Sequence, residues 1–178
     1  MANHVNNIIE ITFPDSQTKN INSILKKLID EYNLVCLYDS HEDTIEWHDN
    51  HIGAKWTRFN DVPFIDDNSL HVCVESAWSE ISPFIDHINY LTDNECSIRH
   101  QFIDECPTFV GSRLYENGEM IDEIYLDNIQ ELLDEEAKKR SLNEGVEDTE
   151  DWRWDWMWDF IYELMEHSSS SSSSSDLD

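Results

Sequence analysis

The sequence predicts an α+β fold in which an antiparallel sheet carries two helices on one face. Three observations lead to this fold class. Apolar and polar residues alternate with a period of two in several segments, which is the pattern of strands with one buried face. Two other segments repeat apolar residues at spacings of three and four, which is the pattern of amphipathic helices. Asn117-Gly118 predicts a tight hairpin, because this pair tolerates positive φ at both turn centres.

The chain is predicted to open with a strand and a helix. Period-two alternation begins at Val5 and stops at Pro14. Apolar residues then recur at helical spacing between Ile21 and Ile29. The predicted inner face of the strand consists of Val5, Asn7, Ile9, Ile11 and Phe13.

Shorter elements are predicted between this helix and the middle of the chain. Residues 34–38 and 44–48 are interpreted as short strands. Residues 49–53 are interpreted as a loop, followed by an extended segment at 54–59. Residues 61–68 contain proline and polar residues and are predicted to form another loop.

The following part of the chain repeats the order of strand, helix and strand. Residues 70–75 alternate as a strand, and a helix begins near Pro83, a residue favoured in the first helical turn. Residues 97–103, 109–115 and 120–125 are predicted strands. A sheet with both helices on one face buries these patterns economically. The element order predicts a ferredoxin-like sandwich with an enlarged antiparallel sheet and a C-terminal helical extension.

Three regions are predicted from changes in composition. Residues 1–125 form the ferredoxin-like domain, and residues 126–167 form an acidic helical extension with a cluster of Trp residues. Residues 168–178 form a serine-rich tail that we expect to be disordered. Within the extension, residues 150–166 are interpreted as a helix, because apolar residues continue at helical spacing beyond Trp158.

The charge of the chain restricts its partners. Lys and Arg number 11 against 39 Asp and Glu, which gives a formal net charge of −28. This charge argues against direct binding to nucleic acid or to an anionic membrane and favours a basic partner. We expect a cytoplasmic protein, because no apolar run approaches the ~20 residues of a membrane span and the four cysteines form no C-x-x-C pair.

Four short motifs follow one another along the first part of the chain: Asn3-His4-Val5-x-Asn7, Gly53-x-Lys55-Trp56, Ala77-Trp78-Ser79 with Pro83 shortly after, and Phe109-x-Gly111. Together, over about residues 1–120, they resemble those of the YubB-like ferredoxin-like family of plasmid and phage proteins. The resemblance implies a ferredoxin-like fold in a protein of mobile genetic elements, and it implies no catalytic residues.

Lys55, Trp56 and Trp78 are candidates for a ligand pocket, in which two indoles and a cation would take a nucleotide-like molecule. Packing of the same side chains on the sheet is the favoured interpretation, because aromatic residues most often serve packing. This region carries the alternative function of a small-molecule binding or enzymatic module.

Two further groups of residues are considered and set aside. His48 and His51 lie three apart in a predicted loop with no clear third metal ligand, so no metal site is predicted. Cys73 and His100 are a possible nucleophilic pair on neighbouring strands, but no oxyanion donor or orienting group accompanies them. We therefore predict no catalytic residues, no cofactor and no enzyme activity.

The function that the sequence favours is an acidic phage or plasmid protein that binds and inhibits a host protein with a basic or nucleic-acid-binding surface. An anti-defence nucleic-acid mimic is the specific form of this hypothesis. A homo-oligomeric structural protein, assembled through the Trp-rich segment, is a further alternative. The predicted partner-binding residues are Glu147, Asp148, Glu150, Asp151, Trp152, Asp155, Trp156, Asp159 and Glu163.

Overall fold

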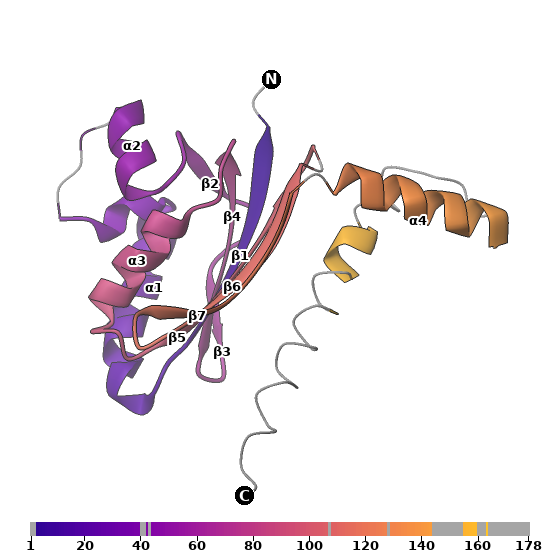
Figure 1. The fold of residues 1–178 in the computed structure, drawn as a ribbon. Coiled ribbons are helices and arrows are strands. Elements are labelled where there is room, and N and C mark those ends of the chain that lie inside the picture. Colours follow the sequence, from indigo (N-terminus) through magenta and orange to yellow (C-terminus); the bar gives the residue numbers. More distant parts are fainter. Residues whose placement is uncertain are drawn as a thin grey trace, which may run out of the picture.

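The computed structural model describes residues 3–39, 42, 44–106, 108–127, 129–143, 155–159 and 163. Among these residues, an open antiparallel sheet forms the centre of the molecule (Figure 1). Three helices lie on one face of the sheet, and a fourth helix projects beyond the opposite face. The helices are α1 (Thr18–Glu31), α2 (Ile45–His51), α3 (Ser82–Leu91) and α4 (Gln130–Asn143).

The sheet has the strand order β2-β4-β1-β5-β6-β7, and β3 also pairs with β4. Every pairing is antiparallel, and β1 lies between β4 and β5. The predicted ferredoxin-like fold with an enlarged sheet is therefore confirmed. The strands are β1 (His4–Thr12), β2 (Thr57–Phe59), β3 (Phe64–Asp66), β4 (Ser69–Ala77), β5 (Ser97–Asp104), β6 (Phe109–Glu116) and β7 (Glu119–Asp127).

Strand β1 shows why one face of the sheet is covered. Its buried and half-buried residues alternate, as the period-two pattern predicts. Ile9 pairs with Val72 of β4 and with His100 of β5, so the inward side chains of three strands form continuous rows. The predicted inner face is confirmed: Val5, Asn7, Ile9, Ile11 and Phe13 are all buried.

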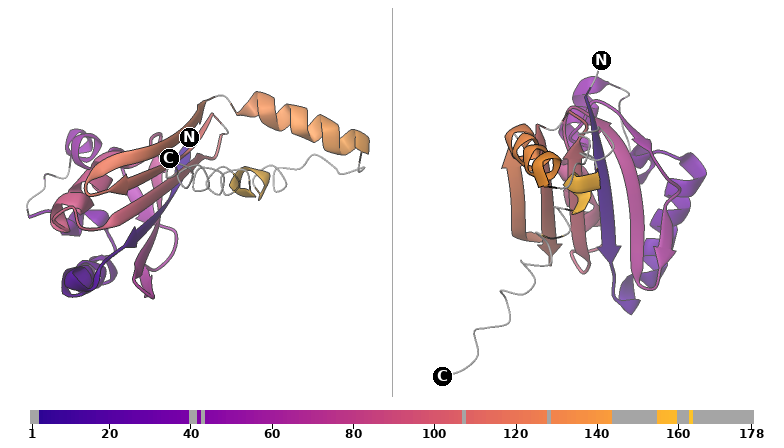
Figure 2. Two further views of the ribbon diagram at one scale, coloured as in Figure 1. Left: turned by 60° about the horizontal axis from the view of Figure 1, so that its bottom comes forward. Right: turned by 90° about the vertical axis from the view of Figure 1, so that its right-hand side faces the viewer.

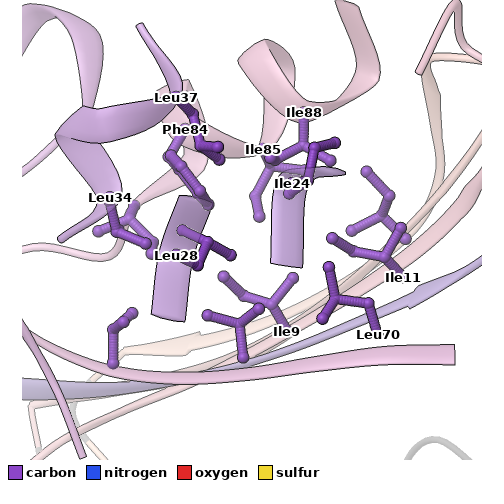
Figure 3. Packing of buried hydrophobic residues seen from close by; sticks show 14 of the residues in the cluster. Ile9, Ile11, Ile24, Leu28, Leu34, Leu37, Leu70, Phe84, Ile85 and Ile88 are labelled. Carbon is purple, nitrogen blue, oxygen red and sulfur yellow. The ribbon is translucent and has the colours of Figure 1, made fainter. Parts of the chain in front are cut away.

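The main core lies between this face and the helices (Figure 3). Helix α1 turns its apolar face to the sheet, and α3 packs beside it. A 3-10 turn, η2 (Leu34–Leu37), closes the far side of the core. Side chains that are almost fully inaccessible include Ile9, Ile11 and Leu70 from the sheet, Leu28 from α1, and Phe84, Ile85 and Ile88 from α3.

Two predicted strands are wrong. Residues 34–37 form η2, with Tyr38 as its C-cap, and the Asn33 side chain accepts a hydrogen bond from the Val35 N–H at 3.0 Å. Residues 45–48 begin α2, which Thr44 caps by accepting a hydrogen bond from the Trp47 N–H at 3.1 Å. Short apolar runs occur both in strands and in buried helical turns, so the sequence pattern does not tell them apart. In both segments a capping side chain stabilises the helical conformation.

The neighbouring predictions change as a consequence. Residues 49–51 belong to α2 rather than to a loop. Within the extended segment predicted at 54–59, only Thr57–Phe59 forms a strand, β2. The predicted loop at 61–68 contains β3, which pairs with β4 through Ile65 and Leu70. The hairpin at Asn117-Gly118 is confirmed, since both residues have positive φ, +54° and +78°.

A second, smaller apolar cluster lies on the opposite face of the sheet. It joins Ile103 of β5 and Val110 of β6 to Leu133 of α4 and to Met157. Figure 2 shows α4 and the helical segment at 155–159 side by side beyond the end of the sheet. This cluster anchors both helical pieces to the sheet.

No helix within the described ranges has the length and apolar character needed to cross a membrane.

Gly111 provides a test of the packing on the covered face. A Cβ at this position would overlap the edge of the Phe102 ring, where it lies 2.7 Å from Cε2, and would lie 2.9 Å from the Ile124 carbonyl oxygen. We expect Gly111→Ala to lower the free energy of unfolding by about 1–3 kcal/mol, because overpacking displaces buried neighbours. Denaturant unfolding measures the change.

The control for this variant is Ser23→Ala on the exposed side of α1. It should change the free energy of unfolding by no more than about 0.5 kcal/mol. A Gly111→Ala protein as stable as the control variant would show that Phe102 moves aside freely and would contradict the packing argument.

Candidate functional site

Two loops meet beside the N-terminus of α3: the loop before β2 and the loop that joins β4 to α3. Gly53 has a φ of +97°, and a Cβ there would lie 2.6 Å from Pro83 Cδ, so glycine is needed at this close approach. The Ser79 hydroxyl donates a hydrogen bond to the Gly53 carbonyl. The Ala77 N–H donates to the Trp56 carbonyl at 3.2 Å. These contacts hold the two loops together.

Trp78 lies at the surface of this loop pair in a left-handed conformation, with φ +67°. Such a conformation costs an L-residue roughly 1–2 kcal/mol. The side chain is 48% exposed, and Lys55 Nζ lies 4.4 Å from the centroid of the indole ring, a cation–π contact. Trp56 instead meets the His4 ring edge to face at 5.3 Å. The structure therefore brings Lys55 to Trp78, and Trp56 belongs to a separate aromatic pair.

A buried polar network lies under these loops. Asn7 Nδ2 donates to Ser76 Oγ at 2.8 Å, and Ser76 Oγ donates to the Ser79 carbonyl at 2.6 Å. His100 Nε2 lies 3.0 Å from Asn7 Oδ1, and its Nδ1 has no hydrogen-bond partner among the described residues. Burial lowers the pKa of His100 to about 4, so this imidazole is neutral at pH 7.

Arg113 of β6 ties the start of α3 to the sheet. Its Nη1 donates to Glu80 Oε1 at 2.7 Å and to the Ser82 hydroxyl, and its Nε donates to Glu123 Oε1 at 2.7 Å. Burial alone would raise the pKa of Glu80, but the hydrogen bonds from Arg113 and Ser82 lower it. Burial also disfavours the charged form of Arg113, yet the two carboxylates raise the pKa of this guanidinium. The result is a fixed, half-buried ion pair.

This network was not predicted from the sequence. Arg113 lies in the strand predicted at 109–115, and no role was predicted for Glu80. One signal was available, because Arg113 is one of only 11 Lys and Arg residues in a very acidic chain and lies inside a predicted strand. A charge in such a strand requires a partner in the fold. The arrangement serves to hold the loop that carries Trp78, and it places no nucleophile beside a base.

The Cys73–His100 pair does not form. The two residues lie on opposite faces of the sheet, since Cys73 pairs with Ile8 and His100 pairs with Ile9 of β1. Glu75, on the same face as Cys73, is instead part of an ion-pair group. Its carboxylate lies 2.8 Å from His4 Nδ1 and 2.8 Å from Arg58 Nη2.

His48 and His51 lie on α2 rather than in the predicted loop. The His51 ring stacks on Trp47 with centroids 4.5 Å apart, and its Nδ1 lies 2.9 Å from the Trp47 carbonyl. In the part of the chain that the structure describes, no group of three or more His, Cys, Asp or Glu side chains is arranged to hold a metal ion. The aromatic contacts give His51 a packing role.

The predicted partner-binding residues are only partly covered by the structure. Asp155, Asp159 and Glu163 are helical and exposed. Trp156 and Trp158 are partly buried against the cluster that contains Met157, which is 3% exposed. The helical interpretation is thus confirmed at 155–159. Glu147, Asp148, Glu150, Asp151 and Trp152 lie outside the described residues.

A family model for the ferredoxin-like domain in Api92-like proteins matches residues 53–148. The chain belongs to this family. The match begins at Gly53 and spans the Lys55-Trp56, Ala77-Trp78-Ser79 and Phe109-x-Gly111 motifs. It confirms a ferredoxin-like domain, and it does not confirm the expected YubB-like family. The Asn3-His4-Val5 motif lies before the matched segment.

The chain is also similar to a crystal structure of the protein api92 from Yersinia pseudotuberculosis, of the same Api92-like family. The identity is 19%, and the TM-score is 0.40. The alignment covers 55% of this chain and 35% of that chain, so this chain spans about a third of that protein's length. No curated protein matches the chain.

The left-handed backbone at Trp78 predicts an unusual order of stabilities. Both Trp78→Ala and Trp78→Gly remove the indole, but only glycine adopts positive φ without steric cost. We therefore expect the Gly variant to be more stable than the Ala variant by about 1 kcal/mol in denaturant unfolding.

Tyr90 supplies the comparison for this pair, because it is 75% exposed and lies within α3. There the order should reverse, with Tyr90→Ala more stable than Tyr90→Gly by roughly 0.5–1 kcal/mol. The same order at both positions would argue against strain at Trp78.

Buried His100 predicts a dependence of stability on pH. Its folded pKa of about 4 is lower than the ordinary value of 6.5, so the unfolded chain binds more protons between these values. The stabilising contribution is complete above pH 6.5 and is lost as the pH falls towards 4. The slope is at most about 1.4 kcal/mol per pH unit.

The variant His100→Gln retains an amide donor towards Asn7 and removes the titration. Unfolding by denaturant at pH 7, 6, 5 and 4 should show a steeper loss for the wild type than for the variant. Parallel profiles for the two proteins would contradict a buried, neutral His100.

Proposed function

We propose that this protein is an acidic binding module that attaches to a basic surface of a host protein. The observation that carries the proposal is the arrangement of Asp155, Asp159 and Glu163, which we call the acidic ridge. These residues are four apart on helical backbone and exposed, while Met157 beside them is buried against the sheet domain. The helix is held by its apolar side and presents its carboxylates outward.

The spacing of the carboxylates in the acidic ridge suits a partner protein that normally binds a polyanion. Carboxylates four residues apart on a helix lie roughly 6 Å from one another. Phosphates recur on a similar scale along nucleic acid, at about 3.4 Å of axis per charge on each strand. With a net charge of −28, the chain would also be drawn towards a positively charged channel. Mimicry of nucleic acid is therefore the form of binding that we favour.

Trp156 and Trp158 would supply apolar contacts beside the ridge. Both are only partly buried in the described structure, and aromatic side chains are frequent anchors in protein interfaces. By sequence, Glu147, Asp148, Glu150, Asp151 and Trp152 extend the same acidic and aromatic composition towards the N-terminus of the segment.

The motif resemblance to YubB-like proteins of plasmids and phages supports a setting on mobile genetic elements. In that setting, a host nuclease of a defence system is a suitable target, because its nucleic-acid channel is basic. Binding in the host cytoplasm would then inhibit the nuclease by occupying the channel.

A second candidate function is binding of a nucleotide-like molecule at Lys55 and Trp78. The exposed indole next to an ammonium group favours it, since a planar anion would find both stacking and charge there. We rank it second because Lys55 already covers one face of the ring, and the charge of the chain repels anionic ligands.

The proposal is tested by capture from host-cell lysate with two matched variants. The ridge variant carries Asp155→Asn, Asp159→Asn and Glu163→Gln. The control variant removes three exposed carboxylates elsewhere, with Asp30→Asn, Glu31→Gln and Asp93→Asn. At low salt, the wild type and the control should retain a nucleic-acid-binding protein that added salt releases, and the ridge variant should retain at least about tenfold less, since its charge contacts are gone.

Two results would count against the acidic ridge. Equal capture by the ridge variant and the control variant would show that the charge as a whole matters and its position does not. Failure of the wild type to retain any nucleic-acid-binding protein at low salt would reject the proposed class of partner.

A further inference from the structure

Strand β7 forms one edge of the sheet and pairs with β6 alone among the described strands. An edge strand presents backbone N–H and C=O groups on its outer side that another strand can use. Residues 119–127 contain no proline, lysine or arginine, which are residues that often protect such edges. The other edge is different, because β2 and β3 are two strands of three residues each.

The usable part of the edge is limited by a bulge. The pairing of β6 with β7 shifts between Leu114 and Tyr115, where Leu114 pairs with Asp122 and Tyr115 pairs with Met120. Ile121 is therefore the extra residue. The remaining residues, 122–127, pair without interruption with β6. Six residues match the ordinary length of a strand.

An aromatic group lies along this edge on the helix-covered side. Tyr125 pairs with Gly111, and the missing side chain at Gly111 leaves room for the Phe102 ring. The centroid of the Tyr125 ring is 6.0 Å from that of Phe102 and 6.0 Å from that of Phe109, onto which it stacks. Tyr125 remains 42% exposed. Its ring is thus held in place and open to a neighbour.

Carboxylates flank Tyr125 on the same side of the strand. Glu123 and Asp127 lie two residues before and after it, so all three side chains point the same way. Glu123 already accepts a hydrogen bond from Arg113, and Asp127 interacts with the Tyr125 hydroxyl, so a cation would meet Asp127 and Tyr125 together. Ile124 and Leu126 alternate with them on the other side of the sheet and are partly buried.

A second copy of this chain is a poor occupant of the edge. Two copies of residues 122–127 would bring two acidic strands together with no basic residue on either of them. Like charges directly opposite each other destabilise a pair of strands, whereas opposite charges stabilise it. The charge pattern selects a basic strand from another protein.

We propose that the β7 edge binds an extended segment of another protein by strand addition, with arginine or lysine at alternate positions and apolar residues between them. One basic side chain would stack on Tyr125, and the next would meet Asp127. The apolar residues would lie beside Ile124 and Leu126. This inference goes beyond the proposed function, because the edge uses none of the side chains of the acidic ridge.

The test uses the full chain and a defined peptide, acetyl-Val-Arg-Val-Arg-Val-Arg-Val-amide. Backbone hydrogen exchange is followed residue by residue by NMR. On addition of the peptide, the outward-facing amides within 122–127 should exchange roughly tenfold more slowly, as expected when a new strand covers them. Added salt should reduce the effect, because arginine contacts contribute to it.

Two controls separate strand addition from general attraction of charge. A peptide of the same charge with proline in place of both inner valines cannot complete the ladder and should give no protection. In the protein, Asp127→Lys should weaken the effect at least fivefold, while Asp66→Lys, an equal charge change on exposed β3, should leave it within about twofold.

Four results would overturn the proposal. Three of them are equal protection by the proline peptide, protection that maps to β2 and β3, and an Asp127→Lys protein that behaves like the wild type. A dimeric mass by light scattering, together with slow exchange at 122–127 before any peptide is added, would also overturn it, since a second copy would then occupy the edge. The ridge variant should bind the peptide normally, so the two proposals fail separately.

Discussion

The amide of Asn7 has to be hydrogen bonded in the interior of the protein, and much of the structure around it follows from that requirement. Asn7 lies on the buried face of the central strand β1, where an unpaired amide would be costly. Ser76 and His100 satisfy it from the two neighbouring strands. Ser76 also bonds to the Ser79 carbonyl, and the Ser79 hydroxyl bonds to the Gly53 carbonyl. One buried polar side chain thereby connects three strands to both loops that surround Trp78.

The acidic side chains are distributed unevenly with respect to this framework. Around the Trp78 loop they are engaged, because Glu80 is paired with Arg113 and Glu75 with Arg58 and His4. Along β7, Glu123 is bound to Arg113, whereas Asp127 is exposed beside Tyr125, and the carboxylates of the segment at 155–159 are exposed beside Trp156 and Trp158. Charge in the first region stabilises the fold, and most of the carboxylates in the second region lie at the surface. The two proposed binding surfaces both belong to the second region.

Long periodic segments were predicted well, and short ones were not. The β1 strand and the α1 helix each repeat their pattern over nine or more residues, and both were recognised. The segments that became η2 and α2 have four and seven residues, too few to separate a period of two from one of 3.6. Of the predicted group of Lys55, Trp56 and Trp78, the structure brings Lys55 to Trp78 and places Trp56 against His4. The Glu80–Arg113 pair was missed because its members are 33 residues apart and share no local pattern.

Sequence alone determined the fold class, the inner face of β1, the hairpin at Asn117-Gly118 and the acidic character, because these depend on local periodicity, turn conformation and composition. Tertiary structure alone decided which polar side chains share the interior. It placed His100 with Asn7 and away from Cys73, and it joined Arg113 to Glu80. The reason is that strand register sets the face on which each side chain lies, and register depends on the pairing of distant segments.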